Sequence, residues 1–164
     1  MPGFEIIGKE EKLELNSIFK NGSVLFRHGF DNKRKGSYKV KEFENNFRKK
    51  FNSKYSLAVT SGTSALRVAL ATLDLKQDDE IITQAFTFVA TVESIVESRA
   101  KPVICEIDET LNMDPNDLIN KISKKTRAVI VVHMLGVPAD LTKIKKICDK
   151  RKIVLIEDTA WGCG

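Results

Sequence analysis

The spacing of apolar residues changes along the chain, from two separate helical patterns to a regular alternation. Residues 10–19 and 38–51 carry apolar side chains at three- and four-residue intervals, which predicts two amphipathic helices. The stretch between them, residues 20–37, is rich in Gly, Asn, Arg and Lys and predicts a long loop. We therefore expect an N-terminal helix and loop in residues 1–37 and a core of alternating helices and strands in residues 38–164.

Short apolar runs alternate with helical patterns over the rest of the chain. The predicted strands are residues 55–60, 80–83, 102–107, 127–133 and 153–156, and the predicted helices are residues 63–73, 87–98, 114–122 and 140–150. Asp114, followed by Pro115, is expected to cap one of these helices, and Asp140 another. This alternation predicts an α/β fold with a mainly parallel sheet covered by helices on both faces.

The composition is ordinary for a globular protein of 164 residues, with 42% hydrophobic and 30% charged residues. The formal net charge of +5 raises the question of nucleic-acid binding, but Lys and Arg are dispersed and no aromatic residues interleave with them. We therefore expect no nucleic-acid partner. No apolar run approaches the roughly 20 residues that cross a bilayer, and the first residues do not have the pattern of a signal peptide. We expect no membrane association.

The cysteines Cys105, Cys148 and Cys163 are odd in number and have no CxxC spacing. This pattern supports neither a disulfide framework nor a zinc site. We expect reduced thiols, no bound metal and a cytoplasmic protein.

Two segments between a predicted strand and a predicted helix carry candidate chemistry. Ser61, Gly62 and Thr63 offer backbone amides and hydroxyls that suit a phosphate, although Ser and Thr are also ordinary N-cap residues. Phe86 and Phe88 open the next helix, where a ring either stacks on a planar ligand or packs in the core. The sequence leaves both alternatives open at each segment.

Two further strands end in polar residues. His133 either lines the same cleft or makes structural hydrogen bonds, and Asp158 either caps a following segment or pairs with a protonated ring nitrogen. Ligands of open α/β sheets bind outside the carboxyl ends of the strands. A phosphate site, an aromatic ring and an acid at those ends together describe a pocket for a flat, phosphorylated nitrogen heterocycle. Pyridoxal 5'-phosphate fits this description.

The ordered series of these segments resembles the DegT/StrS-type family of pyridoxal-phosphate-dependent sugar aminotransferases, which has the fold type I architecture. The similarity runs over essentially the whole chain and rests on SGTSAL at residues 61–66, DEII at 79–82, FTFVAT at 86–91 and ED at 157–158. The resemblance implies that the chain is the N-terminal part of a fold type I large domain, with the small C-terminal domain absent.

The resemblance also implies roles for individual residues. Gly62 and Thr63 are expected to hold the cofactor phosphate, with Ser61 beside them. Phe88 is expected to stack on the pyridine ring, and Asp158 to pair with the pyridinium nitrogen.

The sequence departs from the family at two places. Trp161 stands where the family usually has a glutamine near the phenolic oxygen of the cofactor, and an indole offers one N–H donor and no acceptor. The lysine that forms the Schiff base with the cofactor is expected beyond Gly164. None of the lysines present matches that position, so the chain by itself is expected to be inactive.

The expected substrates follow from the same resemblance. Family members take an amino group from glutamate or glutamine and transfer it to a keto-sugar, either nucleotide-linked or an octulosonate. Residues 1–5 and 27–31 resemble the branch that contains 8-amino-octulosonate transaminases. A homodimer is expected for the full-length enzyme. A sugar dehydratase of the same family, in which a histidine replaces the lysine, and a non-catalytic truncated product are the alternatives.

Overall fold

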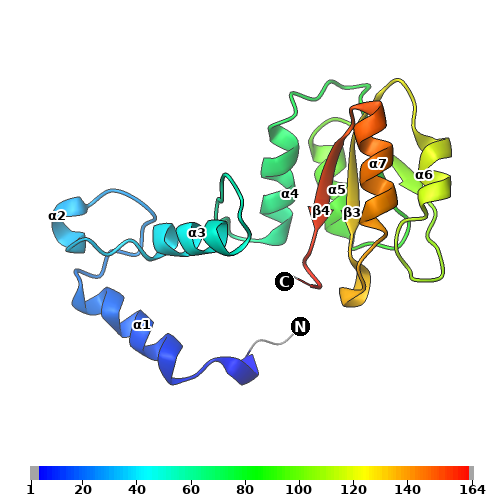
Figure 1. Cartoon of the computed structure of the whole chain (residues 1–164). Coiled ribbons are helices and arrows are strands. Elements are labelled where there is room, and N and C mark those ends of the chain that lie inside the picture. Colours follow the sequence, from blue (N-terminus) through cyan, green and yellow to red (C-terminus); the bar gives the residue numbers. More distant parts are fainter. Residues whose placement is uncertain (1–3, 163–164) are drawn as a thin grey trace. The chain divides into compact units, whose positions relative to one another are not determined.

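The computed structural model describes residues 4–162 (Figure 1). The chain divides into two compact units, Met1–Ala58 and Val59–Gly164. The helix predicted at residues 38–51 therefore belongs to the first unit, whereas the sequence pattern grouped it with the alternating core.

The first unit consists of short helical elements joined by loops. They are the 3-10 helix η1 (Phe4–Ile6) and the helices α1 (Lys9–Lys20), α2 (Asp31–Arg34) and α3 (Lys39–Lys50). The two predicted amphipathic helices are confirmed as α1 and α3. The predicted long loop contains the single turn α2, and the residues that flank it, Phe30 and Lys35, both have left-handed backbone conformations.

Only two of the described residues of the first unit are buried, and both are charged. One is Arg34, which is 4% exposed. Its guanidinium donates hydrogen bonds to the carbonyl oxygens of Gly29 and Phe26 and lies 4.9 Å from the centre of the Tyr38 ring. This side chain thus closes the loop that connects α1 to α3.

The second buried residue of this unit is Glu44 on α3. Its Oε1 accepts hydrogen bonds from the Ala58 N–H at 2.8 Å and from the Arg27 guanidinium at 2.5 Å. These two donors, the Ala58 amide first, hold the pKa of the Glu44 carboxyl below its usual value. Glu44 therefore ties the loop before α2 and the last residue of the unit to α3.

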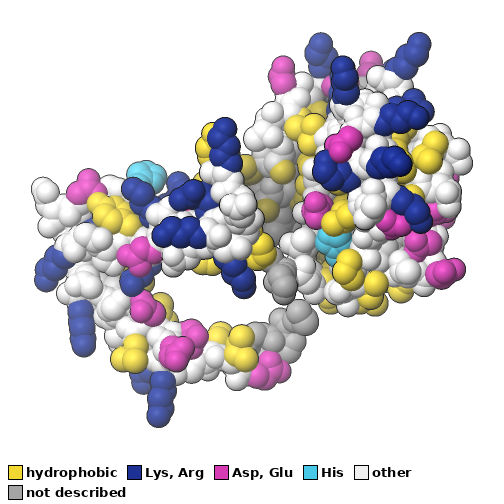
Figure 2. All heavy atoms as spheres, in the orientation of Figure 1, with side chains coloured by type: hydrophobic (Ala, Val, Ile, Leu, Met, Phe, Trp, Pro, Cys, Tyr) yellow, Lys and Arg dark blue, Asp and Glu magenta, His cyan; other side chains and the backbone are white. Residues whose placement is uncertain are grey.

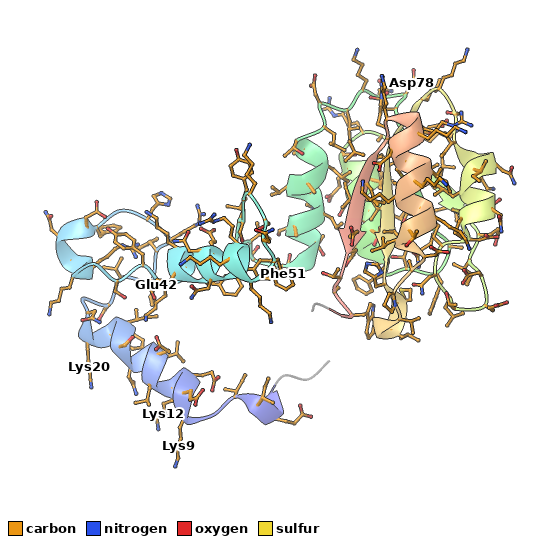
Figure 3. The ribbon with its side chains drawn as sticks, viewed as in Figure 1. Lys9, Lys12, Lys20, Glu42, Phe51 and Asp78 are labelled. Atoms are coloured by element: carbon orange, nitrogen blue, oxygen red, sulfur yellow. The ribbon has the colours of Figure 1, made fainter. Side chains whose placement is uncertain are left out.

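Large apolar side chains of the first unit are exposed instead of packed. On α1 and α3 these exposed residues are Leu13, Leu15, Phe19, Phe43 and Phe47. Figure 2 shows hydrophobic side chains on the surface of this unit. Lys9, Lys12 and Lys20 also project from α1 (Figure 3). The rings of Phe43 and Phe47 lie 5.8 Å apart, and those of Phe47 and Phe51 lie 4.5 Å apart. α3 thus carries a continuous aromatic stripe on its surface.

The second unit is a three-layer α/β structure. Its elements are α4 (Gly62–Ala71), β1 (Glu80–Gln84), α5 (Val89–Glu97), β2 (Lys101–Cys105), α6 (Pro115–Lys121), β3 (Thr126–Val132), η2 (Met134–Gly136), α7 (Leu141–Arg151) and β4 (Val154–Asp158). The four strands have the order β2-β1-β3-β4, and every neighbouring pair is parallel. The predicted α/β fold with a parallel sheet is confirmed.

A separate apolar core fills each side of this sheet. Since successive side chains of a strand point to opposite faces, Ile81 packs with Leu66 and Leu70 of α4, whereas Ile82 packs with residues of α6 and α7. Helices therefore cover both faces, α4 and α5 on one side and α6 and α7 on the other (Figure 1).

The prediction of a strand at residues 55–60 is wrong. This segment pairs with no strand of the described chain, and Tyr55, Leu57 and Val59 are exposed. The sequence pattern reports a local preference for extended backbone, but a strand also needs a neighbour to complete its ladder of hydrogen bonds. Here the Ala58 N–H bonds to the Glu44 side chain instead.

The two predicted N-caps are confirmed. The Asp114 carboxylate accepts a hydrogen bond from the Asn116 N–H at 2.8 Å, and that of Asp140 accepts one from the Lys143 N–H at 3.0 Å. Each satisfies an amide that the first helical turn leaves without a partner. These caps set where α6 and α7 begin.

Adjacent residues on α6 provide a matched test of the core. Leu118 is fully buried, whereas Ile119 is 48% exposed. Leu118→Ala should lower the free energy of unfolding by about 2–5 kcal/mol, because it removes packed methyl groups and leaves a cavity. Ile119→Ala should change it by less than about 0.5 kcal/mol. Urea denaturation followed by circular dichroism measures both, and equal losses would contradict this assignment of the core.

Asp79, just before β1, should make stability depend on pH. Its carboxylate accepts hydrogen bonds from the Lys76 N–H and the Arg127 guanidinium, each at 2.8 Å, and these donors hold the pKa of Asp79 below its ordinary value of 3.8. A carboxyl with a lowered folded-state pKa stabilises the protein above its ordinary pKa, and this stability is lost as the pH falls through the lowered value.

We therefore expect Asp79→Asn to lower the urea midpoint at neutral pH, and the difference from the unmodified protein to shrink as the pH falls below 3.8. Asp78→Asn is the control, because Asp78, which Figure 3 labels, is exposed. Its midpoint should follow the unmodified protein throughout. A pH-independent effect of Asp79→Asn would contradict the assigned role of the ionised carboxylate.

Candidate functional site

The parallel sheet brings the carboxyl ends of its strands to one edge. In the register between β3 and β4, Val132 lies opposite Asp158, and in that between β1 and β2, Gln84 lies opposite Cys105. The segments that follow β1, β3 and β4 therefore begin at the same edge. This is where ligands of open α/β sheets bind.

The order of the strands reverses between β1 and β3. The chain passes from β1 to β2 through α5 on one face and then returns through α6 on the other face to β3. The connections after β1 and β3 consequently lead to helices on opposite faces of the sheet. Such a reversal is the usual place for a ligand in this class of fold.

The first turn of α4 has the features of an anion site. The Ser61 Oγ accepts a hydrogen bond from the Ser64 N–H at 3.1 Å, so Ser61 is the N-cap. The N–H groups of Gly62 and Thr63 donate to no atom of residues 4–162. A side chain on Gly62 would meet no atom within 4 Å, so the space beside these amides is open. Unpaired amides at the positive end of a helix suit a phosphate group.

A cavity of about 350 Å³ lies between α4 and the end of β4. Its lining residues are Gly62, Ala65, Leu66, Ala69, Ile156, Glu157, Asp158, Thr159 and Ala160. The Asp158 Oδ1 accepts a hydrogen bond from the Ala160 N–H at 3.0 Å, and its other oxygen has no partner among the described residues. The structure thus brings Gly62 and Asp158, two of the predicted site residues, to one cavity.

The predicted aromatic residues lie outside this cavity. Phe88 is the N-cap residue of α5 and is 69% exposed, and Phe86 is 41% exposed. Packing of these rings in the core, the alternative that the sequence left open, does not occur. Trp161 is 39% exposed and follows Asp158 by three residues. Neither Phe88 nor Trp161 lines the cavity.

His133 makes structural hydrogen bonds and does not line the cavity. It is 7% exposed at the end of β3, and its Nδ1 accepts a hydrogen bond from the Ala139 N–H at 3.0 Å. Its Nε2 lies 3.6 Å from the Glu157 Oε2. Of the two alternatives for His133, the structural one therefore agrees with the geometry.

Two buried amides that the sequence analysis did not single out support this edge of the sheet. The Gln84 Oε1 accepts a hydrogen bond from the Val132 N–H at 3.0 Å, so it bridges the carboxyl ends of β1 and β3. The Asn112 Oδ1 accepts from the Met134 N–H at 3.0 Å, and its Nδ2 donates to the Val137 oxygen at 3.2 Å. Gln84 directly follows the predicted strand at residues 80–83. A polar side chain at the end of a strand is the sequence signal that could have identified it.

The structure also limits other kinds of chemistry. Burial raises the pKa of the Cys105 thiol to about 12 and that of Cys148 to about 11, so neither is a thiolate nucleophile at neutral pH. The predicted thiol Cys163 lies outside the described residues. Residues 4–162 contain no cluster of His, Cys, Asp and Glu suited to a metal ion. Within the same range, every helix is too short or too polar to span a bilayer.

Comparison with known proteins identifies the family to which this chain is similar. A profile of the DegT/DnrJ/EryC1/StrS aminotransferase family matches residues 16–164. The chain is 39% identical over 158 residues to a GDP-perosamine synthase of Vibrio cholerae. That match covers 96% of this chain and 40% of the relative.

Solved structures agree with this match. An aminotransferase from Psychrobacter cryohalolentis superposes with a TM-score of 0.85 at 30% identity, over 96% of this chain and 38% of that one. A GDP-4-keto-6-deoxymannose-3-dehydratase with a trapped PLP-glutamate geminal diamine superposes with a TM-score of 0.79 at 30% identity, over 93% of this chain and 40% of that one. This chain spans about two fifths of the length of these relatives.

Proposed function

This chain belongs to the DegT/DnrJ/EryC1/StrS aminotransferase family, and from that premise we propose that the protein transfers an amino group to a keto-sugar with pyridoxal 5'-phosphate as cofactor. The observation that carries the proposal is the cavity that Gly62 and Asp158 share. Of the first turn of α4, Gly62 lines this cavity and Ser61 and Thr63 do not. Gly62 offers an amide that suits a phosphate, and Asp158 offers a carboxylate that suits a protonated pyridine nitrogen. The residues present therefore fit this cofactor.

The first turn of α4 would hold the phosphate. The unpaired N–H groups of Gly62 and Thr63 would donate to phosphate oxygens, and the positive end of the helix favours the negative charge. The Ser61 Oγ accepts a hydrogen bond from the Ser64 N–H and shares a second one of 3.0 Å with the Ser64 Oγ. When Ser64 is the donor of that second bond, the Ser61 hydroxyl hydrogen is available to a phosphate oxygen. The absence of a side chain on Gly62 leaves room for a close approach.

Asp158 would accept a hydrogen bond from the pyridinium nitrogen and keep that nitrogen protonated, because an adjacent carboxylate favours the charged form. One of its oxygens is fixed by the Ala160 N–H, and the other is available to a ligand. When bound, pyridoxal phosphate supplies the electron sink that stabilises a carbanion at the carbon bearing the amino group.

The two exposed aromatic residues would complete the contacts. Phe88 is the N-cap residue of α5, in the segment that follows β1, and an exposed ring there can stack on a flat heterocycle. Trp161 would offer its indole N–H as a donor to the phenolic oxygen of the cofactor. Because indole lacks an acceptor, this contact would differ from the one that a glutamine makes.

The names of the relatives support a choice of substrates. The Vibrio cholerae relative is a GDP-perosamine synthase, and the dehydratase structure contains PLP and glutamate. We therefore propose a nucleotide-linked keto-sugar as acceptor and glutamate as amino donor. The octulosonate acceptor suggested by residues 1–5 and 27–31 is the competing substrate.

A sugar dehydratase of the same family is the second candidate, because the dehydratase structure superposes with a TM-score of 0.79. Because the Schiff-base lysine is expected beyond Gly164, the test of the two functions uses the full-length enzyme, incubated with pyridoxal phosphate, glutamate and a nucleotide-linked 4-keto-sugar. Mass spectrometry should detect an amino-sugar if the protein is an aminotransferase. Loss of the 3-hydroxyl without gain of nitrogen would instead identify a dehydratase.

The proposed enzyme is a cytoplasmic homodimer. The free thiols of Cys105 and Cys148 agree with a reducing compartment. The exposed aromatic stripe of α3 and the apolar residues of α1 support association, since contiguous apolar surface of this kind usually contacts a partner.

Two substitutions of Ser61 test the phosphate site. Asp and Asn are both good N-cap residues, so Ser61→Asp and Ser61→Asn should retain the stability of α4. The Asp carboxylate would repel a phosphate, and we expect at least about tenfold weaker binding of pyridoxamine 5'-phosphate than with Ser61→Asn. Equilibrium dialysis measures this affinity without requiring a catalytic lysine.

Pyridoxamine without the phosphate is the control ligand. Its affinity should be the same for the two Ser61 variants, because it brings no anion to the first turn of α4. If Ser61→Asp and Ser61→Asn bind pyridoxamine 5'-phosphate equally well, the phosphate site is not at this helix.

The dimer is tested on α3. Phe47→Glu places a charge in the aromatic stripe and should weaken dimerisation by about tenfold or more, as loss of a buried aromatic anchor does. Asn45→Glu adds the same charge on the opposite side of the helix and should have little effect. Sedimentation equilibrium over a range of concentrations measures both variants. An unmodified protein that stays monomeric would contradict the proposal.

A further inference from the structure

His133 connects three segments at the carboxyl edge of the sheet. Its backbone N–H donates a hydrogen bond of 3.1 Å to the backbone carbonyl oxygen of Asp158. This bond directly follows the last register pair of β3 and β4. Any residue could make this bond through its backbone. The side chain of His133 adds two contacts that another residue would not make.

The first contact closes the loop after β3. The His133 Nδ1 accepts a hydrogen bond from the N–H of Ala139, which is itself buried. A ring nitrogen that accepts carries no hydrogen, so the ring hydrogen lies on Nε2. The orientation of the ring is thereby fixed. Asn112 holds the same loop from a second side through Met134 and Val137.

The second contact reaches β4. The His133 Nε2 faces the Glu157 Oε2 at 3.6 Å, longer than a hydrogen bond but short enough for an electrostatic attraction. Glu157 is the residue immediately before Asp158. The ring therefore spans from the loop after β3 to the strand that carries the acid.

The same loop touches the chain on the other side of Asp158. A side chain on Gly136 would come within 3.4 Å of the Trp161 oxygen, and one on Gly162 would come within 3.4 Å of the Gly136 Cα. The backbone of Gly136 has a φ of +82°, which favours glycine. The turn from Asp158 to Gly162 thus lies directly against the loop that His133 closes.

We propose that His133 is a positioning residue for Asp158: its side chain fixes the loop and the Glu157 side chain on either side of the acid, and so directs the Asp158 carboxylate into the cavity shared with Gly62. Only the identity of the ligand that Asp158 meets rests on the proposed function. The role of His133 in holding the acid rests on the contacts of the second unit alone.

Two variants of His133 separate its contacts. His133→Asn keeps an acceptor near the position of Nδ1, whereas His133→Gln keeps a donor near the position of Nε2 and leaves the buried Ala139 N–H without an acceptor. His28→Gln is the matched control, because His28 is the other histidine of the chain and is exposed in the first unit.

The Ala160 amide reports on Asp158 without any cofactor, because its N–H donates to the Asp158 Oδ1. In His133→Gln, we expect this amide to exchange with solvent about tenfold faster, since the turn is less well held. Exchange at Ile82 in β1 should not change. His133→Asn should restore most of the protection, and His28→Gln should match the unmodified protein. Hydrogen exchange followed by NMR measures each amide.

Glu157→Gln provides a second variant, whose altered side chain is half exposed and contributes nothing to the core. It removes the charge that faces Nε2 and should speed exchange at Ala160 by about threefold. This variant keeps the test available if His133→Gln does not fold. Unchanged exchange at Ala160 in the folded variants would overturn the proposal.

A double-mutant cycle connects this role to the ligand. His133→Gln should weaken binding of pyridoxamine 5'-phosphate by about tenfold in the unmodified protein but have almost no effect in Asp158→Asn, because both changes act through one carboxylate. Additive losses would show that His133 does not act through Asp158 and would overturn the proposal. Faster exchange at Ala160 in a protein that binds no pyridoxamine 5'-phosphate would support the role of His133 and contradict the proposed cofactor.

Discussion

The parallel pairing of β3 with β4 is the constraint on which the candidate site depends. Its register places Val132 opposite Asp158, so the acid and the loop after β3 begin at the same level of the sheet. A shift by one residue would turn Asp158 to the opposite face, because side chains alternate along a strand. Ile156, which packs with the core beside α4, fixes this choice of face. Apolar packing beneath the site thus determines where a charged group points.

Much of the second unit could be predicted from local patterns, and the failures have a common cause. Asp114 and Asp140 cap the expected helices because a cap needs only the next few residues of the chain. Residues 55–60 have a strand-like sequence but no partner strand, and pairing cannot be read from one segment. The shared cavity of Gly62 and Asp158 joins residues far apart in the chain, so only the fold could bring them together.

The role of His133 could not be decided from its residue type alone. The sequence left it between a ligand contact and a structural hydrogen bond, because imidazole is able to serve both. The Ala139 N–H decides between these alternatives by occupying Nδ1. Gln84 and Asn112 act similarly, through backbone groups that no pattern of side chains reveals. The side chains that hold the carboxyl edge of the sheet together are therefore polar and buried, whereas the predicted aromatic contact Phe88 is exposed.

The charged interior of the first unit has a thermodynamic consequence. The heat capacity change of unfolding comes mainly from apolar surface that becomes exposed to water. Among the described residues, this unit buries only Arg34 and Glu44, whereas the second unit has an apolar core on each side of its sheet. Unfolding of the first unit would therefore change the heat capacity of the protein only a little. The step in heat capacity between the folded and unfolded chain would therefore come mostly from the second unit.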